Sequence, residues 1–218
     1  MSIFPRPLKK VLGKIIPFSK EDKVPTFNLG DGVADSTTFL RGDGTWATVS
    51  MGLFAQTASS GIVTATTIET TILDGGVGSL SVPANYFKVG DSFSVSLGGD
   101  ISSANNETIR IKVKSGSVIF GDTGLVTLPS ITNKHYQIEI RFTIRSIGAA
   151  GVASIATFGQ LTYSKNASNA FEGYDFSTIN NTTFSTTTSN TLDITVQWGS
   201  TNASNAIYSE SMILSKLF

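Results

Sequence analysis

The stretch YQIEIRFTIR, residues 136–145, decides the fold class of this chain. Apolar and polar side chains alternate along it one by one, beginning with Tyr136 and Gln137 and ending with Ile144 and Arg145. A period of two over this length predicts a β-strand with one buried and one solvated face, whereas a helix would scatter the apolar residues around its circumference. At about 3.3 Å per residue the strand spans about 33 Å, so it needs partner strands on both sides.

The sequence beyond residue 51 supplies those partners. Glycine- and asparagine-rich turn signals separate the candidate strands, among them Gly98-Gly99-Asp100, Gly121-Asp122 and residues 148–151, and no helical run lies between them. This pattern of many short strands and turns predicts an all-β, antiparallel sandwich or barrel. The mixed pattern over 207–214 predicts a strand that is buried on both faces, at a subunit contact. The candidate strands are 53–58, 61–73, 91–98, 107–114, 117–120, 135–146, 152–163, 170–176, 191–198 and 207–217.

Composition narrows the class of protein. Charged residues make up 15 % of the 218 residues, below the roughly 25 % of an average globular domain, while 40 % hydrophobic residues and 14 Phe suffice for a core. The net charge is zero, but the first 23 residues hold six Lys and Arg against two acidic residues.

There is no Cys for disulfides, and no apolar run is long enough to insert into a membrane. The basic segment is too short, and the remainder too acidic, to predict nucleic-acid binding.

The sequence divides into three parts, at 1–26, 27–50 and 51–218. Residues 1–26 are basic and punctuated by proline, and Leu8, Val11, Leu12, Ile15 and Ile16 follow a helical spacing. Such a short amphipathic segment orders only against a partner, so we interpret it as an extended anchor; a frayed tail and a membrane-surface helix are the alternatives.

Residues 27–50 are a Gly/Asp-rich linker that cannot bury its own apolar side chains. These side chains, the linker pegs, are Phe27, Leu29, Phe39, Leu40 and Trp46.

Several segments together resemble the fibre proteins of tailed bacteriophages. LRGDGTWATV (40–49) is similar to the short segment that precedes the head domain in tail fibres and virion fibres. The later segments resemble the C-terminal jelly-roll modules of phage appendage proteins, whose architecture is similar to that of tumour-necrosis-factor-like trimers. These segments are VPANYFKVGDSFSVSLGG (82–99), ETIRIKVKSG (107–116), HYQIEIRFTIRSIG (135–148), FGQLTY (158–163) and NTLDITVQWGSTNASNAIYSESMILSKL (190–217).

The resemblance implies a homotrimeric fibre on the virion surface with an antiparallel jelly-roll head, which acts by host attachment and not as an enzyme. Threefold association would also bury the linker pegs. We expect attachment to the capsid, with the tail or baseplate as the alternative. The expected anchor contacts, whose basic members would meet an acidic surface, are Ile3, Phe4, Leu8, Lys9, Lys10, Val11, Leu12, Lys14, Ile15 and Ile16.

Catalytic, cofactor and metal sites are not expected. The only histidine, His135, has neither a nucleophile-elbow sequence nor a neighbouring carboxylate, so it is interpreted as an ordinary loop histidine. Arg41-Gly42-Asp43 matches a cell-adhesion tripeptide, but in this glycine-rich context it predicts a turn. The acidic residues from Asp31 onward do not fit a calcium-loop spacing, and an ion on a trimer axis stays an alternative.

The aromatic-rich segment 164–190 is the best candidate for contact with a host receptor or glycan, because aromatic faces framed by small polar residues suit recognition. The alternative is that its aromatics are core residues of a strand at 170–176. A rival of another class is a fibre-borne glycan depolymerase, for which Glu172 and Asp175 are the near carboxylate pair; another is a non-viral trimeric lectin or cytokine-like module. The candidate contacts are Phe171, Tyr174, Phe176 and Phe184.

Overall fold

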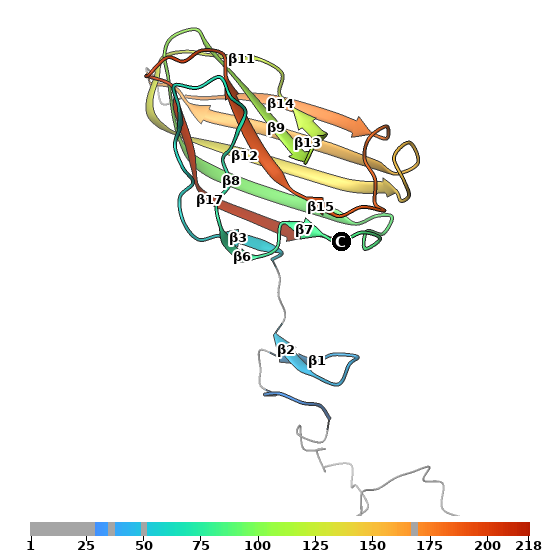
Figure 1. The fold of residues 1–218 in the computed structure, drawn as a ribbon. Coiled ribbons are helices and arrows are strands. Elements are labelled where there is room, and N and C mark those ends of the chain that lie inside the picture. Colours follow the sequence, from blue (N-terminus) through green and yellow to red (C-terminus); the bar gives the residue numbers. More distant parts are fainter. Residues whose placement is uncertain (1–28, 35–37, 49–51, 167–169) are drawn as a thin grey trace, which may run out of the picture. The chain divides into compact units, whose positions relative to one another are not determined.

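The computed structural model describes residues 29–34, 38–48, 52–166 and 170–218, which form two compact units within residues 1–50 and 51–218. The described residues are all-β, and every strand pair is antiparallel (Figure 1). The predicted anchor, with all of its expected contacts, and the peg Phe27 lie outside the described residues.

The first unit is a small hairpin. Strands β1 (Thr38–Leu40) and β2 (Trp46–Thr48) pair, and the turn at Arg41–Gly44 closes with a backbone hydrogen bond from Gly44 to Arg41 of 3.0 Å. Gly44 has a φ of +80°, in the region that glycine favours, and the Asp43 carboxylate accepts hydrogen bonds from the backbone and hydroxyl of Thr45. The tripeptide at 41–43 therefore lies in the turn that the sequence predicts.

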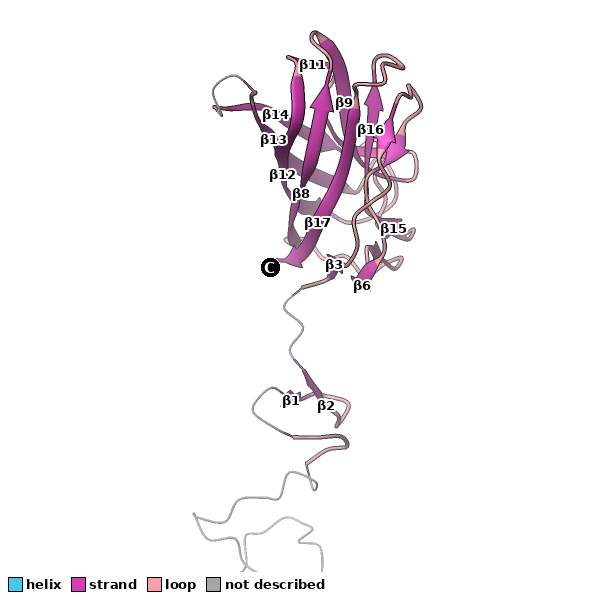
Figure 2. Ribbon diagram, turned by 90° about the vertical axis from the view of Figure 1, so that its left-hand side faces the viewer, coloured by secondary structure: helices cyan, strands magenta, loops and turns pink. Residues whose placement is uncertain are grey.

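The second unit is a two-layered β-sandwich, seen edge-on in Figure 2. Its larger layer has eight strands, and β12, the strand that organises the sequence, lies near its centre with ten or more residues paired on each side. In order across the sheet the strands are β14 (Phe171–Asn180), β13 (Ser154–Ser164), β12 (Ile131–Ser146), β8 (Ser92–Ser103), β17 (Ala206–Lys216), β3 (Phe54–Gln56) and β6 (Gly76–Gly78), with β4 (Val63–Thr64) beside β17.

The smaller layer packs over the larger one. It has five strands, and the two-stranded ladder of β7 with β15 accompanies it. These strands are β10 (Val118–Asp122), β9 (Glu107–Ser115), β16 (Asp193–Trp198), β5 (Thr70–Thr71), β11 (Val126–Leu128), β7 (Ser81–Val82) and β15 (Asn190–Thr191).

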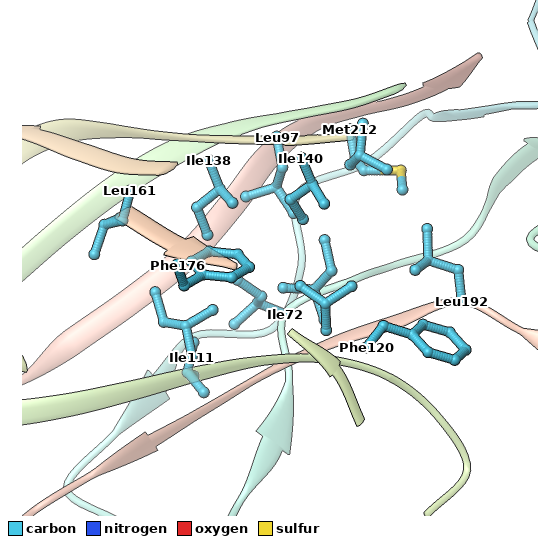
Figure 3. Packing of buried hydrophobic residues seen from close by; sticks show 14 of the residues in the cluster. Ile72, Leu97, Ile111, Phe120, Ile138, Ile140, Leu161, Phe176, Leu192 and Met212 are labelled. Atoms are coloured by element: carbon cyan, nitrogen blue, oxygen red, sulfur yellow. The ribbon is translucent and has the colours of Figure 1, made fainter. Parts of the chain in front are cut away.

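The burial pattern confirms the predicted fold class. Along β12 the apolar residues Ile138 and Ile140 are buried while Glu139 and Arg141 are exposed. The all-β antiparallel sandwich is thus confirmed, whereas the finer jelly-roll connectivity stays a prediction. Figure 3 shows the side chains that fill the space between the layers, including Ile111 from the smaller sheet and Phe176 from the larger.

Three local predictions were wrong. Gly98 and Gly99 do not turn but lie inside β8. At Gly99 the strand requires glycine, because a Cβ there would meet the Tyr208 carbonyl oxygen at 2.0 Å. Gly121-Asp122 likewise belongs to β10. The predicted strand 61–73 is two short strands in different layers, β4 and β5, separated by a left-handed Ala65 with φ of +48°.

The predicted two-sided burial of 207–214 is not seen in the single chain. Met212 and Leu214 point into the core, whereas Ile213 is about half exposed on the opposite face of β17. The subunit contact that this pattern predicted remains a prediction.

An ion-pair cluster holds the chain before β5 against the smaller sheet. The Glu69 carboxylate accepts hydrogen bonds from the ammonium groups of Lys112 (2.5 Å) and Lys114 (2.6 Å) and from the Thr195 hydroxyl (2.9 Å). The two lysines, above all Lys112, lower the pKa of Glu69 from 4.5 to about 2.

A pH dependence of stability follows from this cluster. Because the pKa of Glu69 is lower in the folded chain, its contribution is fully present above pH 4.5 and is lost as the pH falls towards about 2. We expect Glu69→Gln to lower the free energy of unfolding at pH 6 and to have a much smaller effect at pH 2, as measured by urea denaturation. An equal effect at both pH values would contradict the assignment.

Candidate functional site

A hollow of about 360 Å³, hereafter called the groove, lies on the outward face of the larger sheet, over β8, β12, β13, β14 and β17. Strand register brings its residues together: Gly98 of β8 pairs with Gln137 of β12 on one side and with Ser211 of β17 on the other. These three residues form a row across the sheet, on the face opposite the core.

The groove is hollow because its floor has small side chains. Ser96, Gly98 and Ser211 line it where larger residues would fill the space. The nearest atom to a side chain built at Gly98 would be 3.6 Å away, so glycine is not forced there by crowding. The absence of a side chain at this position instead leaves room above the sheet for a ligand.

A polar cluster from three strands lies beside the groove, and His135 is the member that lines it. The His135 Nδ1 lies 2.5 Å from the Asp100 Oδ1, and the Tyr208 hydroxyl donates a hydrogen bond of 3.0 Å to the other oxygen of Asp100. This hydrogen bond is the main cause of the raised pKa of Tyr208. The Asp100 side chain is only 21 % exposed while that of His135 is 87 % exposed, so the imidazole is presented to solvent beside a largely buried carboxylate. The distance makes this an ion-pair contact, and the Asp100 Oδ1 accepts no hydrogen bond from the described residues.

A second polar group extends along the same face. Glu139 accepts hydrogen bonds from the Ser96 hydroxyl at 2.6 Å and from the Gln137 side-chain amide at 2.5 Å. Glu210 also lines the groove and acts electrostatically on Tyr208. The groove therefore offers carboxylate oxygens, hydroxyl groups, an amide and an imidazole within one hollow.

Phe171 supplies an aromatic surface at the groove. It is the first residue of β14, lines the groove and is 80 % exposed. A sugar ring can pack its apolar face on such a ring while its hydroxyl groups reach polar neighbours. The sequence prediction that Phe171 contacts a receptor or glycan stays a prediction, now with a defined site around it.

The other predicted aromatic contacts lie elsewhere. Phe176 and Phe184 are buried in the core, so the prediction of a surface contact is wrong for both. The alternative, core residues of a strand at 170–176, is correct for Phe176 of β14, whereas Phe184 is buried outside any strand. Tyr174 is half-buried; it stacks on Tyr163 with 6.4 Å between ring centroids and donates a hydrogen bond to the Thr127 carbonyl.

Sequence reasoning missed the groove's polar cluster. It placed His135 in a loop without an orienting carboxylate, whereas His135 lies within β12 and pairs in register with Asp100 of β8. The only local signal was the position of His135 beside the organising strand. Its partner could not be found locally, because Asp100 was assigned to a turn that does not exist.

The carboxylate pair needed for the depolymerase alternative does not form. Glu172 pairs with Tyr163 on the core-facing side of β14, where it accepts a hydrogen bond from the Tyr163 hydroxyl at 2.6 Å. Asp175 pairs with Gln160 on the opposite face of the strand. Two carboxylates on opposite faces of one strand cannot flank the same glycosidic bond.

Among the described residues, no group of three or more His, Asp or Glu side chains is arranged to hold a metal ion. The same residues include no helix with the length and apolarity to cross a bilayer. No protein-family model, no curated protein and no solved structure matches the chain.

Proposed function

We propose that this chain is a homotrimeric virion fibre of a tailed bacteriophage whose head binds a host-surface glycan in the groove. Residues 1–26 would anchor it to the capsid, with the tail as the alternative attachment point. The proposal describes a binding protein on the virion surface and requires no cofactor.

The groove is the observation that carries this proposal. Its hollow floor, its exposed Phe171 ring and the polar side chains that line it match the chemistry of a sugar, which has apolar ring faces and a rim of hydroxyl groups. These polar side chains include His135, Gln137 and Glu210. A neutral sugar needs both hydrogen-bond donors and acceptors. The Glu210 carboxylate can accept, while the Ser211 hydroxyl and the second N–H of the Gln137 amide can donate.

The first unit supports the threefold part of the proposal. Leu29, Phe39 and Leu40 are between 41 % and 46 % exposed, and Val33 is more exposed still. A unit of two three-residue strands cannot cover these side chains itself. Three copies around one axis would bury them against one another, as the linker of a fibre requires.

A glycan-binding measurement tests the function. We expect the full chain to bind purified bacterial surface polysaccharides on an array and Phe171→Ala to weaken that binding at least tenfold, because a buried Phe contributes about 1.5–3 kcal/mol. Phe158→Ala is the matched control, since Phe158 is 65 % exposed on the same face but does not line the groove.

Two results would contradict the proposal. One is that no polysaccharide binds to the folded chain. The other is that Phe158→Ala weakens binding as much as Phe171→Ala, because the contact would then lie outside the groove. Cleavage of a bound polysaccharide would favour the enzyme alternative, with carboxylates other than Glu172 and Asp175 as its catalytic pair.

A further inference from the structure

A second hollow lies inside the sandwich, between its two layers, and is separate from the groove. Its volume is about 130 Å³, and the wall is almost wholly apolar, with side chains from the larger sheet, from β10 and from the segments around β7 and β15. An engineered apolar cavity of about 150 Å³, lined by Leu, Ile and Phe, stays dry and binds benzene or xenon. This cavity therefore has the size that accommodates one six-membered ring.

Five phenylalanines make the wall aromatic. They form an unbroken series of ring contacts whose successive centroids are 5.6, 6.0, 6.0 and 5.7 Å apart, and three of the four contacts are edge-to-face. A guest in this space would meet both ring edges and ring faces, an arrangement that favours an aromatic guest. In the order of contact the rings are Phe142, Phe93, Phe87, Phe184 and Phe120.

The polar side chains in the wall already have partners within the protein. The Asn190 amide donates to the carbonyls of Ser185 (2.9 Å) and Thr188 (3.0 Å). The Ser79 hydroxyl donates to the Ser81 carbonyl, and the Ser81 hydroxyl shares a hydrogen bond of 2.6 Å with Thr191. A buried water needs two to four polar partners, so these groups leave little to hold water in the cavity.

We propose that the cavity is a binding site for a small, uncharged aromatic molecule of about the size of benzene. The geometry and the apolar wall select against charged or strongly polar ligands, because neither a charge nor an additional hydrogen bond would find a partner there. The proposal does not depend on the glycan function, since it concerns a different space and a different class of ligand.

Methyl NMR spectra of the full chain titrated with benzene test this site. We expect the signals of Ile144, Ile155 and Leu192, which line the cavity, to shift in a saturable manner. The signals of Ile111 and Leu161, equally buried but outside the wall, should not shift. Cyclohexane, similar in size but without a ring face, should bind at least threefold more weakly.

Two variants locate the site. Leu192→Phe adds atoms to the wall and should weaken benzene binding at least tenfold, and Leu80→Phe, at a half-buried wall position, gives the same test should Leu192→Phe fail to fold. Ile111→Val is the control and should bind like the wild type. The proposal is overturned if benzene produces no saturable shifts, if Ile111 and Leu161 shift as strongly as the wall residues, or if cyclohexane binds equally well.

Discussion

Gly159→Ala is expected to lower the free energy of unfolding by about 2 kcal/mol, although inside a strand alanine is normally more stable than glycine. The reason is the ring of Phe176, which lies directly over Gly159 of the neighbouring strand. A Cβ at Gly159 would meet the Phe176 ring at 2.0 Å, and one at Gly121 of the smaller sheet would meet it at 2.5 Å. The ring thus occupies a slot between glycines of both layers.

A double-mutant cycle distinguishes this slot from a general intolerance of the strand. Phe176→Ala alone should cost about 3–5 kcal/mol through the cavity that it leaves, but adding Gly159→Ala to it should cost almost nothing more. Chemical denaturation measures all four free energies, and Gly61→Ala, where the new methyl group meets nothing within 4 Å, is the control. Additive effects would show that the ring does not depend on Gly159.

The full chain is expected to have a mass of about 69 kDa in solution, three times the 23.0 kDa of one chain. Replacing Phe39 and Leu40 together by Asp should shift the mass towards 23.0 kDa, since charges at the proposed contact cannot be buried without partners. Both residues are exposed in the single chain, so the change should leave the head folded. Light scattering measures the mass.

Leu125→Asp is the matched control, because Leu125 is also an exposed leucine but belongs to the head. A wild-type mass near 23.0 kDa would contradict the fibre proposal. A trimer that survives the double replacement would place the threefold contact in the head and not in the linker pegs, and the segment 51–218 should then form a trimer by itself.

The sequence predicts the long strands well because their signal is local. Alternation in 136–145 depends only on which residues face the core, and the structure repeats it residue by residue. The errors have a non-local cause. Gly98-Gly99 has the composition of a turn, but Gly99 is there because the Tyr208 backbone passes close by, and Tyr208 is far away in the sequence.

The candidate site was predictable only in part, for the same reason. Phe171 could be proposed from its polar surroundings, whereas Phe176 and Phe184, in similar local sequence, are buried by contacts with distant parts of the chain, such as the Phe120 ring of β10 against Phe184. The groove combines Ser96, Gln137 and Ser211, which meet only through strand register. No local pattern specifies that register before the sheet is assembled.

The pairing of β3 with β17 has a mechanical consequence. The chain enters the head beside its last strand, where Leu53 donates a backbone hydrogen bond of 2.8 Å to Leu214, and β3 pairs with β17 through only two residues. Tension along the chain that precedes Leu53 would load these few bonds first and reach the twelve-residue β8 afterwards. Among the described strands, the only other partner of β3 in the sheet is the three-residue strand β6. Under load β3 can thus separate from β17 while the long strands that carry the groove keep their register.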